Sequence, residues 1–331
     1  MKYYILILIS FTCLSPLYSQ ILYTQTVEDL KSYKKNSTDI IKEANDIVVS
    51  KEVFSIVNKT MFEVSKDKHD YVSMASYWWP NPKTENGLPY VVKDGELNEE
   101  VYENYRDFKQ LVEFSKSIKT LGIAYYLSRD SKYILEAERK LRGWFVDDET
   151  KMNPNMNHSQ FIKGINQGRI EGIIDARYFI DVIEGIDLLS MDGGFNRSLG
   201  NSLQNWFRQF LIWMETSTIG KRGFQLKNNI ATSYHLQRMV YNTFIGKSNK
   251  AIEVYEGDFS KLFDNQIDSK GAQPLELKRT KAYGYSTSNL GYLKKGITLA
   301  SNLRGADVHL NGNRHNKVIK AQEFIDNRLK K

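Results

Sequence analysis

Apolar residues along most of this chain recur at intervals of three and four, the spacing that gives an α-helix one hydrophobic face. A long helix is expected from Arg106, and a short turn at 128–131 separates it from a second, so the two form a helical hairpin. Further helices are expected at about 29–34, 38–48, 172–189, 199–216, 230–244, 287–302 and 317–329. No convincing alternation of apolar and polar residues predicts a strand. The pattern predicts an all-α protein built from helical hairpins.

A stretch rich in aromatic and turn-forming residues, from about 71 to 98, interrupts this pattern. Its prolines and glycines exclude a regular helix or a central strand. Tyr77, Trp78 and Trp79 stand together within it. Because aromatic faces stack on the C–H faces of sugar rings, these side chains are candidates for carbohydrate binding. The alternative is that the tryptophans anchor the loop on the core.

The N-terminus has the form of a secretory signal: Met1-Lys2 precedes an apolar run over 3–14 and then small and polar residues. The run is shorter than the roughly 20 residues that a membrane-spanning helix needs. We therefore expect a signal peptide at 1–19, one domain at 20–331, and a periplasmic or secreted protein without membrane attachment. The only cysteine, Cys13, lies inside this signal, so the mature chain would have no disulfide.

The net charge of +7 favours an acidic partner. An anionic polysaccharide, a nucleic acid or a membrane surface would each suit this charge. The basic residues are scattered among acidic ones, which is not typical of a nucleic-acid interface, and we expect no nucleic-acid partner. The five histidines lack metal-site spacing, and no glycine-rich phosphate loop occurs, so neither a metal nor a cofactor is expected. Acidic pairs such as Asp175 with Asp181 leave sugar hydrolysis as a minor alternative.

Four motifs in a fixed order carry more specific information. They are Tyr77-Trp78-Trp79-Pro80-Asn81-Pro82; Met152-Asn153-Pro154-Asn155-Met156-Asn157 leading into Asn166-Gln167-Gly168-Arg169 and Gly172-Ile173-Ile174-Asp175; Lys227-Asn228-Asn229-Ile230; and Gln273-Pro274-Leu275-Glu276-Leu277-Lys278-Arg279-Thr280 followed by Tyr283-Gly284-Tyr285. Together they resemble the alginate lyase family of polysaccharide lyases over about residues 69–302. The resemblance implies an α/α toroid, an incomplete barrel of helical hairpins, with the aromatic loop over a deep cleft. It also implies β-elimination on alginate or a related uronate polymer.

A lyase of this kind neutralises the uronate carboxylate, removes the C5 proton and protonates the leaving oxygen. By resemblance, Arg279 neutralises the carboxylate, Asn229 stabilises the developing charge, and Tyr285 transfers protons, with Tyr283 as its rival. We expect Arg279 to favour the charged form of the phenol. On spacing alone, Arg279 could be a surface arginine and Tyr285 a packed tyrosine. The substrate-binding prediction comprises Tyr77, Trp78, Trp79, Asn228, Tyr234, His235, Arg169 and His158.

One position departs from the family pattern: the family has Asn-Asn-His where this chain reads Asn228-Asn229-Ile230. His235 cannot replace that histidine, because five residues along an ideal helix turn it about 140° away from Ile230. Three accounts stay open: Tyr285 performs both proton transfers, His158 or His69 enters the cleft from a loop, or the protein binds polysaccharide without cleaving it. We expect a lyase, with the catalytically impaired binding protein as the alternative.

Overall fold

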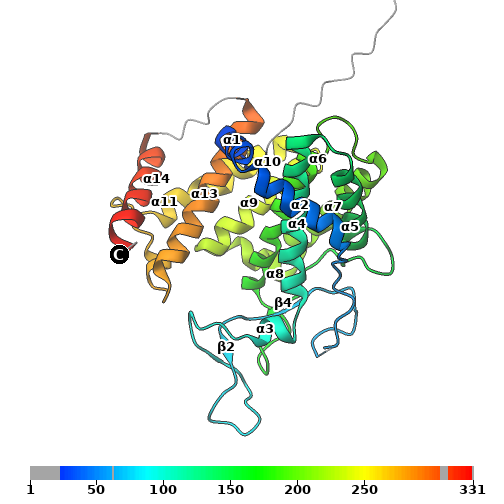
Figure 1. The fold of residues 1–331 in the computed structure, drawn as a ribbon. Coiled ribbons are helices and arrows are strands. Elements are labelled where there is room, and N and C mark those ends of the chain that lie inside the picture. The colour runs from blue at the N-terminus through cyan, green and yellow to red at the C-terminus, as the bar shows by residue number, and fades with distance from the viewer. Residues whose placement is uncertain (1–22, 62, 306–311, 330–331) are drawn as a thin grey trace, which may run out of the picture.

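The computed structural model describes residues 23–61, 63–305 and 312–329, and helices dominate this part of the chain (Figure 1). The expected signal at 1–19 and Cys13 lie outside the described residues. Within the described residues, no helix has the length and apolar character to cross a membrane. The prediction of a helical fold is confirmed.

The first helices follow the predicted boundaries closely. Helix α1 (Val27–Lys35) begins at a capping box formed by Thr26 and Asp29, and α2 (Ser37–Ser50) follows directly. Helices α4 (Asp107–Ser128) and α5 (Lys132–Phe145) form the expected hairpin. Helix α6 (Phe179–Leu189) packs against α4 where Gly122 and Gly185 meet. A Cβ on Gly122 would lie 2.5 Å from the Gly185 carbonyl oxygen, so this close approach requires glycine.

Helix α9 (Asn229–Phe244) lies at the centre of the fold, and all of its residues are buried. It contacts α7 (Arg197–Thr216), α10 (Ser248–Val254) and α13 (Ala282–Arg304). Several of its buried polar side chains are hydrogen-bonded, such as the Tyr241 hydroxyl, which donates to the Ala176 carbonyl at 2.6 Å. A helix buried on every side holds its N-terminus in a fixed place, and that end borders the cavity described below.

Several elements differ from the prediction. The segment expected as one helix over 172–189 starts as a 3₁₀ helix, η1 (Ile170–Tyr178), and α13 starts at Ala282 rather than near 287. Several short helices of the structure were not predicted, because a short helix has too few turns to give a periodic signal. They are α3 (Glu100–Glu103), α8 (Thr218–Phe224), α10, α11 (Ser260–Gln266) and α12 (Pro274–Leu277), with the π-helical turn η2 (Tyr255–Phe259). The C-terminal segment forms α14 (Gly312–Phe324) and the π-helical η3 (Ile325–Leu329).

Short strands also occur, although none was predicted. Strand β1 (Val72–Met74) pairs in parallel with β4 (His158–Phe161), and β2 (Trp78–Trp79) pairs antiparallel with β3 (Val91–Val92). The β1–β4 register matches Val72 with His158 and Met74 with Phe161, so β4 contains one extra residue. This bulge contains Gln160, whose φ of 47° lies in the left-handed region. The segment around β2 and α3 extends from one end of the helical body (Figure 1).

Candidate active site

A cavity of 380 Å³ brings together the larger part of the predicted catalytic and binding residues. The aromatic loop, β4, η1, the N-terminus of α9 and the start of α13 contribute its walls. The predicted residues that line it are Tyr77, Arg169, Asn228, Asn229, Arg279 and Tyr285, together with Ile230. Because α13 begins at Ala282, Tyr285 lies in the first turn of this helix, close to Arg279.

Arg279 and Tyr285 are in direct contact. Nη2 of Arg279 donates a hydrogen bond to the Tyr285 hydroxyl at 2.8 Å, and the guanidinium carbon lies 4.0 Å from the centre of the phenol ring. The same Nη2 lies 2.7 Å from Oδ1 of Asp94. Asp94 also accepts from the backbone N–H and the hydroxyl of Thr280, at 3.0 and 2.9 Å. The aromatic loop therefore holds Arg279 in place through a carboxylate that sequence reasoning missed.

Burial and Arg279 act in opposite directions on the pKa of Tyr285. Burial raises the pKa of Tyr285 above its usual value, and a hydrogen bond with Tyr77 raises it further. Arg279 lowers the pKa, as predicted, but does not overcome these effects. The pKa of Tyr285 is raised overall, because burial removes more water from the hydroxyl than the cation compensates. Arg279 in turn holds the pKa of Asp94 well below its usual range, so that carboxylate is ionised.

The two asparagines at the start of α9 have different environments. Asn228 is the N-cap, and its side-chain oxygen accepts from the backbone N–H of Ile230 at 3.2 Å. The backbone N–H of Asn229 donates to Oε1 of the buried Glu276 at 2.9 Å. Oδ1 of Asn229 is buried and has no hydrogen-bond partner among the described residues. Asn229 thus has unused hydrogen-bonding capacity at the cavity wall, whereas the Asn228 side-chain oxygen is engaged in capping.

Ile230 lines the cavity, and no histidine of the described chain does so. His158 is held by Asp70, whose Oδ2 lies 3.5 Å from Nε2, and by the Gln167 carbonyl at 3.0 Å. His69 Nδ1 lies 2.7 Å from the Lys151 carbonyl oxygen. These positions do not support the account in which one of these loop histidines replaces the missing one.

The prediction that Tyr234 and His235 bind substrate is not supported by their positions either. Tyr234 is buried and donates to the Met214 carbonyl at 3.0 Å. His235 is buried against the Phe224 ring, 5.1 Å between ring centres, and Nη1 of Arg238 lies 3.3 Å from its Nδ1. Burial, together with the charge of Arg238, lowers the pKa of His235 to about 4, so the ring is neutral at neutral pH. Both side chains instead connect α9 to its neighbours, Tyr234 to α7 through Met214 and His235 to α8 through Phe224.

The two tryptophans anchor the aromatic loop and do not line the cavity. Trp78 packs against a small hydrophobic cluster under the loop, and its carbonyl accepts from Asn98 at 2.8 Å. Trp79 donates its indole N–H to the Glu96 carbonyl at 3.0 Å, and Lys93 lies 4.9 Å from its ring centre. Of the three predicted aromatic platforms, only Tyr77 therefore lies in the cavity wall.

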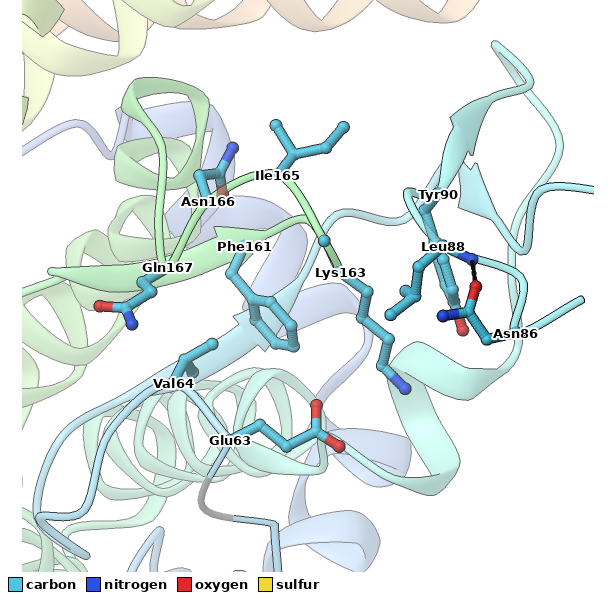
Figure 2. Close-up of a pocket in the computed structure, with 11 residues that line it drawn as sticks. Glu63, Val64, Asn86, Leu88, Tyr90, Phe161, Lys163, Ile165, Asn166 and Gln167 are labelled. Atoms are coloured by element: carbon cyan, nitrogen blue, oxygen red, sulfur yellow. Dashed lines mark hydrogen bonds between the residues drawn. The ribbon is translucent and has the colours of Figure 1, made fainter. Parts of the chain in front are cut away.

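A second cavity of 590 Å³ lies under the aromatic loop (Figure 2). Figure 2 shows the Lys163 side chain extending into this cavity between Glu63 and Tyr90, and its Nζ lies 5.6 Å from the centre of the Tyr90 ring. The Lys163 ammonium is ion-paired with Glu100, and Glu63 accepts from the Tyr105 hydroxyl at 2.7 Å. The lining of this larger cavity has one cation and one carboxylate, Lys163 and Glu63. The cavity beside Arg279 has an excess of cations, with three arginines and two carboxylates in its lining, and therefore suits an acidic substrate better.

The glycines of the predicted motifs explain how Arg169 reaches the active cavity. A Cβ on Gly168 would lie 1.9 Å from the Asn157 carbonyl oxygen, and one on Gly172 would lie 2.1 Å from Oγ of Ser159. These glycines let the segment that includes Arg169 pack directly on β4. The backbone N–H of Arg169 then donates to the Ser159 carbonyl at 3.1 Å.

This arrangement, an arginine and a tyrosine in contact beside the N-terminus of a buried helix in a fold of helical hairpins, defines a polysaccharide lyase of the α/α-toroid class. The alginate lyase family model matches residues 55–325, and the chain belongs to this family.

Solved structures agree with this assignment. An alginate lyase from Bacteroides ovatus is 34% identical, with a TM-score of 0.84 over 91% of this chain and 82% of that chain. Alginate lyase A1-III from Sphingomonas species A1, at 12% identity, shares the fold with a TM-score of 0.56 over 94% of this chain and 80% of that one. The predicted α/α toroid is confirmed. No curated protein matches the chain significantly.

Proposed function

We propose that this lyase cleaves alginate or a related uronic-acid polymer by β-elimination in the cavity beside Arg279. The observation that carries the proposal is the 2.8 Å hydrogen bond between Arg279 and Tyr285. A permanent cation and a phenol at this distance can act on one sugar, the first on its C6 carboxylate and the second on its C5 proton. The Arg279 guanidinium already binds one carboxylate, because its Nε and Nη2 donate to Asp94 at 3.3 and 2.7 Å. This geometry also suits the carboxylate of a substrate.

Three residues of the cavity then perform the chemistry. Arg279 binds the substrate carboxylate, and the Asn229 amide stabilises the negative charge that spreads onto it when the C5 proton leaves. Tyr285, as phenolate, accepts the C5 proton and delivers it to the glycosidic oxygen as the C4–O bond breaks and the C4–C5 double bond forms. Since Ile230 cannot carry a proton, Tyr285 performs both transfers, which suits substrates whose C5 proton and leaving oxygen lie on one side of the ring.

The same observations favour one alternative, a protein that binds the polymer without cleaving it. Ile230 supplies no base, and burial keeps the Tyr285 phenol protonated. The two functions differ in their product, because only β-elimination creates a conjugated C4–C5 double bond.

The deciding experiment incubates purified protein, residues 20–331, with alginate and other uronate polymers and follows ultraviolet absorbance of the C4–C5 double bond. Rising absorbance is the expected result. Flat absorbance on every polymer, with binding detected by calorimetry, would establish the binding protein instead.

We also propose that the protein is exported to the periplasm or the cell exterior, which the sequence pattern of 1–19 supports. N-terminal sequencing of the protein from fractionated cells tests this proposal. An uncleaved cytoplasmic chain would exclude it.

A further inference from the structure

Arg169 is a cation of the active cavity whose carboxylate partner is distant and exposed. Its Nη2 donates to the side-chain oxygen of Gln160 at 3.0 Å, a neutral acceptor. Its Nε is buried without a hydrogen-bond partner in the described part of the chain. The nearest paired carboxylate, on Glu171, lies 3.8 Å from that Nε and is 43% exposed, so solvent weakens the pair. Arg279, by contrast, holds Asp94 at 2.7 Å.

A third arginine of the cavity, Arg177, is engaged elsewhere. It donates to the Ile174 carbonyl and to the Tyr178 hydroxyl, each at 2.9 Å, and its guanidinium lies 4.2 Å from the centre of the Tyr178 ring. Neither Arg169 nor Arg177 has a short ion pair within the described residues, but Arg169 alone of the two has a buried guanidinium nitrogen without a hydrogen-bond partner there.

Asp175 determines which end of the Gln160 amide faces Arg169. Nε2 of Gln160 donates to Oδ1 of Asp175 at 2.8 Å, so the amide oxygen must point to the arginine. Asp175 itself is buried and is fixed by the hydroxyls of Tyr71 and Ser73, at 3.1 and 2.7 Å. A carboxylate, an amide and a guanidinium thus form one chain of hydrogen bonds that ends in the cavity.

The backbone conformation at Gln160 directs its side chain toward Asp175 and Arg169. Its φ of 47° is a conformation that side-chain-bearing residues rarely adopt, and it lies at the bulge of β4. The Ser73 hydroxyl accepts from the Gln160 backbone N–H at 2.8 Å and so stabilises the bulge. Bulges of this kind redirect a side chain, and here the redirected amide lies between Asp175 and Arg169.

We propose that Gln160, oriented by Asp175, is a positioning residue that presents Arg169 as a second carboxylate receptor, so that the site recognises two neighbouring uronates. The inference rests on the proposed function, because every residue of a uronate polymer bears a carboxylate. Arg279 binds the carboxylate of the sugar that reacts, and Arg169 binds that of its neighbour. A neutral amide suits this task because it orients the guanidinium without neutralising it.

The test is binding by calorimetry in a Tyr285→Phe background, with alginate oligosaccharides and with the same oligosaccharides after partial reduction of their carboxylates to alcohols. Binding is measured without turnover, so the result does not depend on whether the protein is catalytic. Gln160→Glu places a carboxylate against Arg169 at nearly unchanged size. We expect the Kd for intact oligosaccharides to rise about tenfold, because roughly one charge-assisted contact is lost. The preference for intact over reduced ligand should also fall.

Two further variants separate positioning from folding and from overall charge. Gln322→Glu on α14 makes the same charge change beside Lys294, far from the cavity lining, and should bind like the parent protein. Arg169→Lys should keep part of the preference for intact ligand, whereas Arg169→Met should lose it. Folding of every variant is checked by thermal melting. If folded Gln160→Glu and Arg169→Met both keep the parent preference, Arg169 is not a carboxylate receptor and the inference is overturned.

Discussion

The guanidinium of Arg279 both covers the Tyr285 ring, at 4.0 Å from its centre, and bonds to its hydroxyl at 2.8 Å. The Arg279 guanidinium therefore favours the phenolate form of Tyr285 and is also placed to bind a substrate carboxylate. Asp94 occupies the other side of the guanidinium, at 2.7 Å from Nη2. The protonation of the tyrosine and the binding of the substrate thus depend on the same three side chains.

Replacing Tyr285 by phenylalanine tests its role in proton transfer. Tyr285→Phe should lower kcat at least about a thousandfold, within the range of general acid–base catalysis, while substrate still binds. Ultraviolet absorbance gives kcat, and calorimetry gives the affinity. Tyr283→Phe is the matched control, because Tyr283 lies in the same first turn of α13 but is exposed. Near-normal turnover by Tyr285→Phe, or a comparable loss in Tyr283→Phe, would exclude the assignment.

The pH profile should report the raised pKa of Tyr285. Below that pKa the phenolate fraction grows about tenfold per pH unit, so kcat/KM should rise toward alkaline pH. The negative charge of Asp94 contributes to the raised pKa. Asp94→Asn should therefore move the rising limb to lower pH by about 0.5–1 unit.

The control for this shift keeps the charge and removes a neighbouring bond. Thr280→Val deletes the 2.9 Å hydrogen bond from the Thr280 hydroxyl to Asp94 but leaves the carboxylate ionised. Its profile should coincide with that of the parent protein. A profile for Asp94→Asn that does not move, or moves to higher pH, would show that Asp94 does not tune Tyr285.

The helical architecture could be predicted because long helices repeat their apolar positions many times, as in α4 and α7. The strands could not, since β2 and β3 contain two residues each. Nor did periodicity locate the start of α13, where polar residues and glycines replace a hydrophobic stripe. The family motifs identified Arg279 and Tyr285, which the structure brings into contact.

Contacts between distant segments account for what the sequence did not reveal. Asp94 lies 185 positions from Arg279, and nothing in the local Asp94-Gly95 turn indicates that partner. Trp79 resembles a sugar platform in sequence, but its N–H is engaged by the Glu96 carbonyl. Gln160 lies in a polar connection whose bulge exists only because β4 pairs with β1. The position of each of these side chains is set by tertiary packing. No local pattern in a single sequence indicates such packing.

Restoring the histidine tests how the site works without it. Ile230 lines the cavity in the first turn of α9, so Ile230→His should place an imidazole beside Asn229. Burial favours the neutral ring, which can act as a base. We expect the rate of double-bond formation on alginate at pH 7–8 to rise, on the order of tenfold. Ile230→Asn controls for polarity alone and should not gain activity. A folded Ile230→His with no gain would mean that Tyr285 alone meets the needs of this cavity.

The buried imidazole of His235 should make stability depend on pH in a defined direction. Its pKa is about 4 in the folded protein, against about 6.5 unfolded, so the unfolded chain takes up the proton first as pH falls. Stability from this residue is complete above about pH 6.5 and is lost toward pH 4, with about 2 kcal/mol lost between pH 7 and 5. Urea unfolding of the parent protein and of His235→Gln at both pH values measures the difference.

The variant His158→Gln provides a control of opposite sign. The pKa of His158 is raised, mainly by Asp70, so its contribution is present at low pH and disappears as pH rises. His158→Gln should therefore keep or increase the acid loss of stability, whereas His235→Gln should be less stable at pH 7 but lose about 2 kcal/mol less on acidification. Equal acid losses in the parent protein and His235→Gln would show that this imidazole does not resist protonation, and that the packing of Phe224 and Arg238 around it leaves it open to water.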